Sequence, residues 1–575
     1  MTLTAAKMPA FDPKLSIVQG ATRPELSRLT LGQLIDKQAE RYGSKDAIII
    51  GWSETRLSYR DLAERTKQLA RALMALGIRK GDRVAILSGD DVRFVELFFA
   101  AARVGACLVI INKTYTVPEC ERALKHTEPH TLFLMDVVDR RSTKPLLEKL
   151  AKDRGNIKNV VLTRWDQLPG KPPATWDDVL SMADSVSPAA LESLEKTVDI
   201  HSTANIQFTS GTTGSPKAAM LTHSNIGNNG FYIGDYLQLS PSDVVCCGPP
   251  LFHCFGLVAG LMSALTHGAS IIFAQRDFDA PAVCGMLIRE RATVLHGVPT
   301  MFTAVLNELE RSGRKITTLR KGIAAGTKIP PALLTELERK LGYEHIAITY
   351  GMTETSPASF MTKVGDSTER KLETVGRIFP HATAKIVNTD NRIVPRGSRG
   401  EVCVAGWLVQ QGYFRNPEKT AEVMIKDSDG ILWMHTGDEG MIDDDGYLTI
   451  TGRIKDMIIR GGENIYPLEI EERLLHHPAI SGAAIVGCKD DRFGESVNAF
   501  LQIRPGQKKP SLGALVEWVR GALARHKAPV RVFWVGAGEP IKEYPVTGSG
   551  KIRKEILREI GNGLIIPSTS RTSKL

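Results

Sequence analysis

The chain alternates helix-like and strand-like patterns over about half of its length, from Leu57 to Tyr350. Short runs of consecutive apolar residues predict buried strands, and runs with apolar residues three or four positions apart predict helices. Strands are expected at 83–87, 107–111, 269–273, 322–325 and 346–350, and helices at 61–76, 92–104, 256–265 and 299–310. Such alternation is typical of helices layered on a mainly parallel sheet. The sequence therefore predicts an α/β fold built of layered subdomains.

The pattern changes after Gly376, where turn signals at 390–391, 396–397 and 445–446 separate strand-like runs. This predicts a small β subdomain that completes the large domain. Beyond it, helices are expected at 468–475 and 512–525, and strands at 483–487 and 499–503. Because 575 residues exceed what one core organises, more than one domain is expected. We expect an N-terminal domain over 1–452, a hinge over 453–456, a small mobile C-terminal α+β domain over 457–565 and a flexible tail over 566–575.

Composition excludes several classes of function. The chain is 42% hydrophobic and 24% charged with a formal net charge of +9, and it has no long Lys/Arg cluster of the kind that binds nucleic acid. Its eight cysteines show no Cys-x-x-Cys pair, which disfavours a zinc site or a disulfide framework and suits a reducing compartment. The most apolar stretch, 97–111, is interrupted by Arg103 and Gly105 and is too short to span a bilayer.

A loop rich in hydroxyl groups and glycine lies between two short strand-like runs, 204–208 and 218–221. Glycine lets the main chain approach a ligand closely, and a loop of backbone N–H groups, hydroxyls and one cation is typical of phosphate binding. It is not the common P-loop, because Pro216 precedes the lysine and a strand, not a helix, is expected to follow. An ordinary surface turn is the alternative. The residues that would contact phosphate are Thr209, Ser210, Gly211, Thr212, Thr213, Gly214 and Lys217.

An aromatic ring, a hydroxyl and a carboxylate follow the expected strand 346–350, at Tyr350, Thr353 and Glu354. Magnesium ions prefer one or two carboxylates combined with phosphate oxygens and water, so this loop suits a metal-bound nucleotide. Taken alone, a Thr-Glu-Thr run is also a helix N-cap pattern.

Together these runs resemble the signature motifs of the adenylate-forming superfamily, which comprises acyl-CoA synthetases, the adenylation domains of nonribosomal peptide synthetases and beetle luciferases. The resemblance covers nearly the whole chain, and it looks closest to medium-chain and fungal secondary-metabolite peroxisomal acyl-CoA ligases. Further runs that carry it, in order, are Pro249–Gly256, 296–301, Gly326-Thr327-Lys328, His435–Asp438, Gly452-Arg453, 460–471 and Pro545–Ile552.

The resemblance implies roles for individual residues. Thr353 would contact the α-phosphate, Glu354 would hold Mg²⁺, and Lys551 would bridge the carboxylate and the α-phosphate during adenylation. Lys455 would lie at a hinge. ATP or AMP would further contact the phosphate loop named above and Gly326, Thr327 and Tyr350, and its ribose would contact Asp438 and Arg453. Coenzyme A would pass Gly461, Gly462 and Glu463, and the acyl pocket would be lined by Phe252, His253, Cys254, Gly256 and Val298.

The reaction implied is that of an AMP-forming acid–thiol ligase with Mg²⁺ as cofactor and ATP and CoA as co-substrates. A medium-chain, branched or hydroxylated acid would be converted to acyl-adenylate with release of pyrophosphate, and the acyl group would then pass to CoA after the small domain rotates. A stand-alone adenylation enzyme that loads a carrier protein, and a luciferase-like oxygenase, are the alternatives. Amino-acid-loading enzymes usually carry an Asp early in the pocket, and none stands between Pro249 and Gly260.

The last three residues, Ser573-Lys574-Leu575, match the tripeptide that peroxisomal import receptors bind. The preceding tail is polar, as an address that a receptor must reach would be. We therefore expect the peroxisome as the location and its import receptor as a partner, with no nucleic-acid partner and no transmembrane segment.

Overall fold

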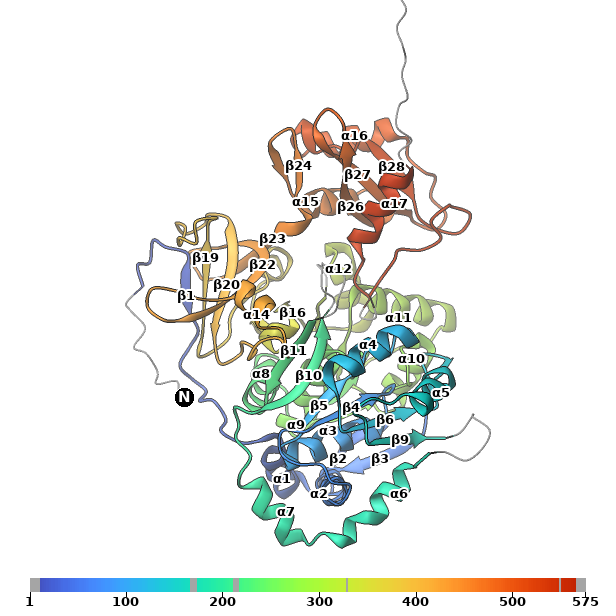
Figure 1. Cartoon of the computed structure of the whole chain (residues 1–575). Coiled ribbons are helices and arrows are strands. Elements are labelled where there is room, and N and C mark those ends of the chain that lie inside the picture. Colours follow the sequence, from blue (N-terminus) through green and yellow to red (C-terminus); the bar gives the residue numbers. More distant parts are fainter. Residues whose placement is uncertain (1–10, 166–172, 210–216, 327–328, 548–549, 565–575) are drawn as a thin grey trace, which may run out of the picture. The chain divides into compact units, whose positions relative to one another are not determined.

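A computed structural model describes residues 11–165, 173–209, 217–326, 329–547 and 550–564 (Figure 1). Within them the chain forms two compact units. The first contains the described residues up to Lys385, together with Cys403–Thr436 and Asp443–Leu448. The second contains Ile386–Val402, Gly437–Ile442 and the described residues from Thr449 onward.

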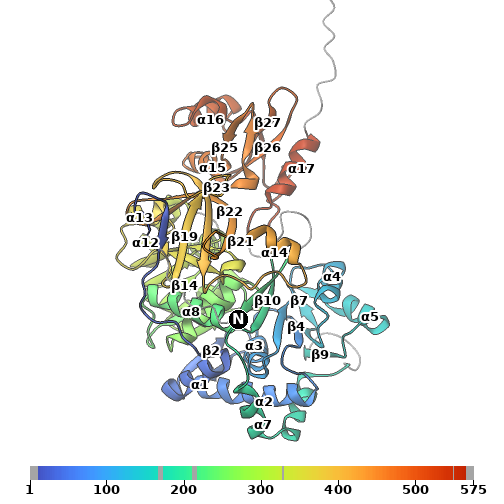
Figure 2. The same ribbon diagram turned by 60° about the vertical axis from the view of Figure 1, so that its left-hand side comes forward.

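The first sheet of the first unit has the strand order β11-β10-β5-β4-β6-β9. Its strands run parallel, except that β11 is antiparallel to β10. Side chains of alternate residues, such as Val109, Leu132 and Ile206, share a core with α4 (Val117–Thr127) and α5 (Lys144–Lys152), which lie on one side of the sheet in Figures 1 and 2. The strands are β4 (Arg83–Leu87), β5 (Cys107–Ile110), β6 (Thr131–Met135), β9 (Asn159–Arg164), β10 (Thr203–Thr209) and β11 (Lys217–Thr222), and a small hairpin adds β7 (Val137–Val138) and β8 (Arg141–Ser142).

Clear capping signals set the bounds of the neighbouring helices. Ser58 and Asp61 form a reciprocal capping box at the start of α2, and the Asp91 side chain accepts a hydrogen bond from the Arg93 N–H at the start of α3. Gly105 ends α3 in the left-handed region, at a φ of 70°. The helices in this part of the chain are α1 (Leu31–Tyr42), α2 (Tyr59–Ala75), α3 (Val92–Val104), α6 (Trp176–Ser181) and α7 (Pro188–Glu195), with a short 3₁₀ helix at Met182–Ser185.

The second sheet of this unit has the order β18-β17-β16-β15-β14-β12-β13-β2-β3. Its inner strands are parallel, and α10 (Ala280–Arg289), α11 (Pro299–Ser312) and α12 (Pro331–Leu341) share a core with them. The strands are β2 (Asp46–Ile50), β3 (Thr55–Ser58), β12 (Val244–Cys247), β13 (Ser270–Phe273), β14 (Val294–His296), β15 (Lys321–Ala324), β16 (His345–Gly351), β17 (Ala358–Met361) and β18 (Arg377–Ile378). Helix α8 (His223–Tyr236) packs against a π-helix (Phe255–Met262) that continues into α9 (Ser263–Thr266).

A third sheet has the order β1-β19-β20-β22-β21, and β23 pairs with β22. Its strands are β1 (Ile17–Gln19), β19 (Ala382–Val387), β20 (Gly400–Gly406), β21 (Met424–Lys426), β22 (Leu432–Ile442) and β23 (Leu448–Arg453), with α14 (Pro417–Val423) between β20 and β21. Helix α13 (Thr368–Glu373) lies between β17 and β18 of the second sheet.

The C-terminal part of the second unit has its own five-stranded sheet, in which β26 and β27 form a long antiparallel pair. Its core joins Ile485 and Leu501 of these strands to Ile470 of α15 and Leu515 of α16. The elements are β24 (Ile458–Arg460), β25 (Glu463–Ile465), α15 (Pro467–Leu475), β26 (Ile480–Asp490), β27 (Gly494–Ile503), α16 (Leu512–Arg520), β28 (Arg531–Trp534) and α17 (Lys554–Leu564), with 3₁₀ turns at Ile454–Asp456 and Arg525–Lys527.

The predicted α/β class is confirmed, and two of its helices need correction. The helix expected over 512–525 ends at Arg520. The run expected as a helix over 256–265 begins as a π-helix at Phe255. A side chain at Gly256 would meet the Pro250 carbonyl oxygen at 2.2 Å, so tertiary contact with the preceding turn shapes this segment. Among the described residues, no helix combines the length and the apolar character that crossing a membrane requires.

Candidate active site

The expected phosphate loop joins the two strands of a β-hairpin. Thr209, the last residue of β10, pairs with Lys217, the first residue of β11. The flanking strands are therefore as predicted, and no helix opens at the lysine, so the arrangement differs from a P-loop. Five predicted contact residues lie outside the described residues: Ser210, Gly211, Thr212, Thr213 and Gly214.

Thr353 and Glu354 lie in a 3₁₀ turn (Thr353–Thr355) that follows β16. Glu354 is buried, and its backbone carbonyl accepts a hydrogen bond from the Gln410 N–H at 2.9 Å. Tyr350, near the end of β16, is partly exposed, and its ring centroid lies 6.2 Å from that of Phe360. The alternative interpretation of this run is the N-cap of a helix. The run forms only a three-residue 3₁₀ turn, and the next element is the strand β17, so it does not cap an α-helix.

Tyr413 is a site residue that sequence reasoning missed. Its hydroxyl donates a hydrogen bond to Glu354 Oε1 at 2.8 Å, and the Lys217 ammonium lies 4.9 Å from its ring centroid. The Tyr413 side chain thus contacts both Lys217, which is predicted to bind phosphate, and Glu354, which is predicted to bind Mg²⁺. Its immediate sequence neighbours, Gly412 and Phe414, are apolar and did not signal this role.

The predicted acyl segment meets the predicted nucleotide turn. Cys254 Sγ lies 3.4 Å from Thr353 Oγ1, and burial raises the pKa of this thiol to about 12, so it remains a neutral S–H group. The His253 Nδ1 atom accepts a hydrogen bond from the Phe255 N–H at 3.1 Å, so the His253 ring contacts the first residue of the π-helix. The Lys113 ammonium lies 5.6 Å from the Phe252 ring centroid.

Two other predicted residues are also neighbours. A side chain at Gly326, where φ is +91°, would approach Val298 Cγ1 to 3.2 Å. Val298 is buried and precedes the first residue of α11. Thr327, predicted with Gly326, lies outside the described residues.

A buried carboxyl group that the sequence did not single out supports the acyl segment. Asp90 Oδ1 accepts a hydrogen bond from the Leu251 N–H at 2.8 Å. Burial raises the pKa of this carboxyl to about 7, and the positive charge of Lys113 opposes the shift. Asp90 therefore fixes the backbone one residue before Phe252.

In the second unit, the two residues expected at the ribose are paired. Arg453 Nε lies 2.8 Å from Asp438 Oδ1, and Asp438 is buried. The positive charge of Arg453 is the main cause that lowers the pKa of the Lys551 ammonium to about 8, loss of hydration is the second, and the Asp438 charge opposes both. Lys551 is exposed, and the charge of Arg453 is the largest of these effects.

The predicted hinge and CoA residues lie in short turns of the same unit. Lys455 lies in the 3₁₀ turn Ile454–Asp456. Gly461 and Gly462 connect β24 to β25 with φ values of +60° and +85°, conformations that glycine adopts readily. Glu463 is the first residue of β25 and is exposed.

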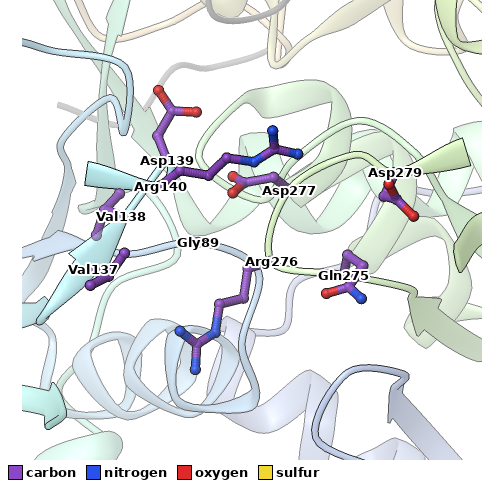
Figure 3. A pocket seen from close by; sticks show the side chains of 9 residues that line it. All are labelled: Gly89, Val137, Val138, Asp139, Arg140, Gln275, Arg276, Asp277 and Asp279. Carbon is purple, nitrogen blue, oxygen red and sulfur yellow. The ribbon is translucent and has the colours of Figure 1, made fainter. Parts of the chain in front are cut away.

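A separate cavity of about 510 Å³ opens where loops after β4, β6 and β13 meet. Figure 3 shows Arg276 turned away from the other charged side chains, and its guanidinium lies 4.1 Å from the Trp52 ring centroid. Among the residues that the structure describes, none predicted from the sequence to form the site lines this cavity. The lining residues are Gly89, Val137, Val138, Asp139, Arg140, Gln275, Arg276, Asp277 and Asp279.

The chain matches a family model described as AMP-binding enzyme over residues 35–414 and one described as AMP-binding enzyme C-terminal domain over residues 469–551. The acyl-CoA ligase sidI of Aspergillus fumigatus is 45% identical, over 100% of this chain and 98% of that protein. The human mitochondrial medium-chain acyl-CoA ligase ACSF2 is 34% identical, over 95% of this chain and 89% of that protein.

Among solved structures, ATP-bound MatB from Rhodopseudomonas palustris aligns with a TM-score of 0.78 at 28% identity, over 93% of this chain and 99% of that one. The order of the motifs, the two-part family match and the full-length relatives agree. The chain belongs to the family of AMP-binding, adenylate-forming enzymes.

Proposed function

We propose that this enzyme is an ATP-dependent acyl-CoA ligase. The acid's carboxylate attacks the α-phosphorus of ATP, which forms acyl-adenylate and releases pyrophosphate. The CoA thiol then attacks the acyl carbonyl, which forms the thioester and releases AMP. The observation that carries the proposal is the contact between Cys254 of the acyl segment and Thr353 of the nucleotide turn. An acyl pocket and a nucleotide site must adjoin each other where the carboxylate of the acid reacts with the α-phosphate.

The acid we propose is a medium-chain, branched or hydroxylated one. The π-helix that follows Cys254 is apolar and buried throughout, as the wall of an acyl pocket would be. The test is ATP-dependent consumption of CoA across a panel of free acids that differ in length, branching and hydroxylation. Acids that consume ATP without forming thioester would instead indicate an enzyme that loads a carrier protein.

Glu354 fits the role of a magnesium ligand. Its carboxylate is buried beside the hairpin that carries the phosphate loop, and one of its oxygens already accepts the Tyr413 hydroxyl. Magnesium takes one or two protein carboxylates and completes its shell with phosphate oxygens and water. Glu354 would supply one carboxylate, and ATP and water would supply the remaining ligands. Bound there, the ion would neutralise charge on the phosphates during adenylation.

Replacing Asp438 with alanine is expected to raise the KM for ATP by about tenfold or more, because a buried charged acceptor contributes on the order of 1.5–3 kcal/mol. The KM for the acid should stay the same. Steady-state kinetics with each substrate varied will measure both. Asp445→Ala is the matched control, since Asp445 is exposed and pairs with Arg370. A raised KM for the acid with an unchanged KM for ATP would contradict the ribose role.

We further propose a peroxisomal location, supported by the tripeptide Ser573-Lys574-Leu575, which lies outside the described residues. Deleting these three residues is expected to move a fluorescent fusion from peroxisomes to the cytosol, because the import receptor would lose its motif. Activity of the purified protein should not change. Continued peroxisomal import of the shortened chain would refute the proposal.

A further inference from the structure

Tyr413 lies between two groups of opposite charge that come from distant parts of the chain. Its hydroxyl donates to Glu354 Oε1 at 2.8 Å, and its ring centroid lies 4.9 Å from the Lys217 ammonium. Both Tyr413 and Glu354 are only 4% exposed. A hydrogen bond from a hydroxyl to a carboxylate is stronger when water is excluded, and so is the attraction of a cation to an aromatic face.

The backbone around Tyr413 is fixed on both sides. The Met220 N–H donates to the Gly412 carbonyl at 3.0 Å, and the Phe414 N–H donates to the Ala218 carbonyl at 2.8 Å, so this segment extends the β10–β11 hairpin. The Gln410 N–H, in turn, donates to the Glu354 carbonyl at 2.9 Å. One short segment therefore ties the strand that begins at Lys217 to the turn that carries Glu354.

The cap of the next helix adds a further restraint. The Tyr413 N–H donates to Thr420 Oγ1 at 2.9 Å, and the Asn416 side chain caps α14 by accepting from the Lys419 N–H. A side chain at Gly412, where φ is +134°, would approach Thr420 to 2.9 Å, so the close fit depends on glycine there. Hydrogen bonds of the Tyr413 backbone therefore help to fix the position of its side chain, in addition to the hydrogen bond of its hydroxyl.

We propose that Tyr413 is a positioning residue for nucleotide activation. Its hydroxyl holds the Glu354 carboxylate in the orientation that receives the metal ion, and its ring holds the Lys217 ammonium beside the phosphate loop. The ring attracts the ammonium by its charge and accepts no directed N–H bond, so it sets the position of Lys217 without fixing the direction of its donors. This inference rests on the proposed magnesium role of Glu354 and goes beyond it by naming the residue that orients the carboxylate.

The test is Tyr413→Phe, which removes the hydroxyl and keeps the ring. We expect the Mg²⁺ concentration for half-maximal ATP binding, measured by calorimetry, to rise about tenfold, the size of one lost hydrogen bond to a charged group. The KM for the acid should not change. Because the readout is nucleotide binding, the experiment does not require the acid to be known. Failure of the acyl-CoA ligase proposal would be recognised by a different experiment, the panel of free acids.

Two further variants separate positioning from a general structural role. In a Glu354→Gln background, Tyr413→Phe should cause no further change in Mg²⁺ dependence, because the carboxylate it orients is gone. Tyr59→Phe is the matched control: the Tyr59 hydroxyl is buried and donates to the Ala269 carbonyl at 2.7 Å, away from the site. It should lower the melting temperature without changing Mg²⁺ dependence.

The proposal is overturned if Tyr413→Phe binds ATP with unchanged Mg²⁺ dependence. It is overturned equally if Tyr59→Phe shifts that dependence as much, since the effect would then report general loosening of the fold. A Tyr413→Phe effect that persists in full with Glu354→Gln would show that the hydroxyl does not act through this carboxylate, which also refutes the proposal.

Discussion

Replacing Lys551 with alanine is expected to lower the rate of acyl-adenylate formation by about a hundredfold or more, the size of effect seen when one donor to a developing charge is removed. Lysine supplies a compact point charge on a long side chain, which suits charge that develops only in the transition state. The measurement is acid-dependent exchange of pyrophosphate into ATP, which reports the first half-reaction alone.

The second half-reaction gives the control for this variant. Lys551→Ala, supplied with pre-formed acyl-adenylate and CoA, should still make thioester at a near-normal rate, because the bridging role implied for Lys551 belongs to adenylation. Lys554→Ala is a matched variant three residues away, at the start of α17, where the Lys554 ammonium forms an ion pair with Glu471 at 2.6 Å. It should leave both half-reactions close to normal. An equal loss of both steps in Lys551→Ala would contradict a role limited to adenylation.

Elements with strong local signals were predicted to the residue. The strand Arg83–Leu87 and the helix Val92–Val104 have the predicted bounds. The apolar pattern marks both elements, and the Asp91 cap and the Gly105 terminus mark the two ends of the helix. These signals act over a few residues, so local sequence carries the information. The large α/β part and the separate C-terminal helices and strands followed from the same signals.

The segment after His253 shows where local pattern fails. Its residues are apolar on all sides, so periodicity predicts a buried helix but cannot distinguish an α-helix from a π-helix. The difference comes from packing: Gly256 lies against the Pro250 carbonyl, and a side chain at Gly260 would meet Cys247 Sγ at 2.5 Å. Those partners come from the preceding turn and from β12, and their distances cannot be read from the run itself.

The candidate site was predictable where its residues form runs and was missed where they act alone. Thr353 and Glu354 stand in a recognisable run, as does Lys217. Tyr413 stands apart from both in the sequence, and only the pairing of its segment with β11 brings it to them. The same holds for Asp90, whose role depends on burial next to the acyl segment. Burial and long-range pairing are tertiary properties, so composition and spacing do not report them.

The pH dependence of adenylation is expected to have a falling limb near pH 8. The pKa of Lys551 is lowered to about 8, chiefly by the positive charge of Arg453. Below this pH the ammonium is protonated and carries the charge that adenylation needs, and above it the charge is lost. The value of kcat/KM should therefore fall about tenfold per pH unit above the pKa, because this parameter reports the free enzyme.

Substituting arginine for Lys551 tests the assignment of that limb. A guanidinium stays protonated throughout the range in which an enzyme can be assayed, so Lys551→Arg should keep some adenylation activity and lose the falling limb. Wild-type kcat should fall only at higher pH than kcat/KM, since bound phosphate favours the charged ammonium. Profiles of pyrophosphate exchange between pH 6 and pH 10 will show both effects. A limb that stays near pH 8 in Lys551→Arg would assign the titration to another group and separate Lys551 from the charge that drives adenylation.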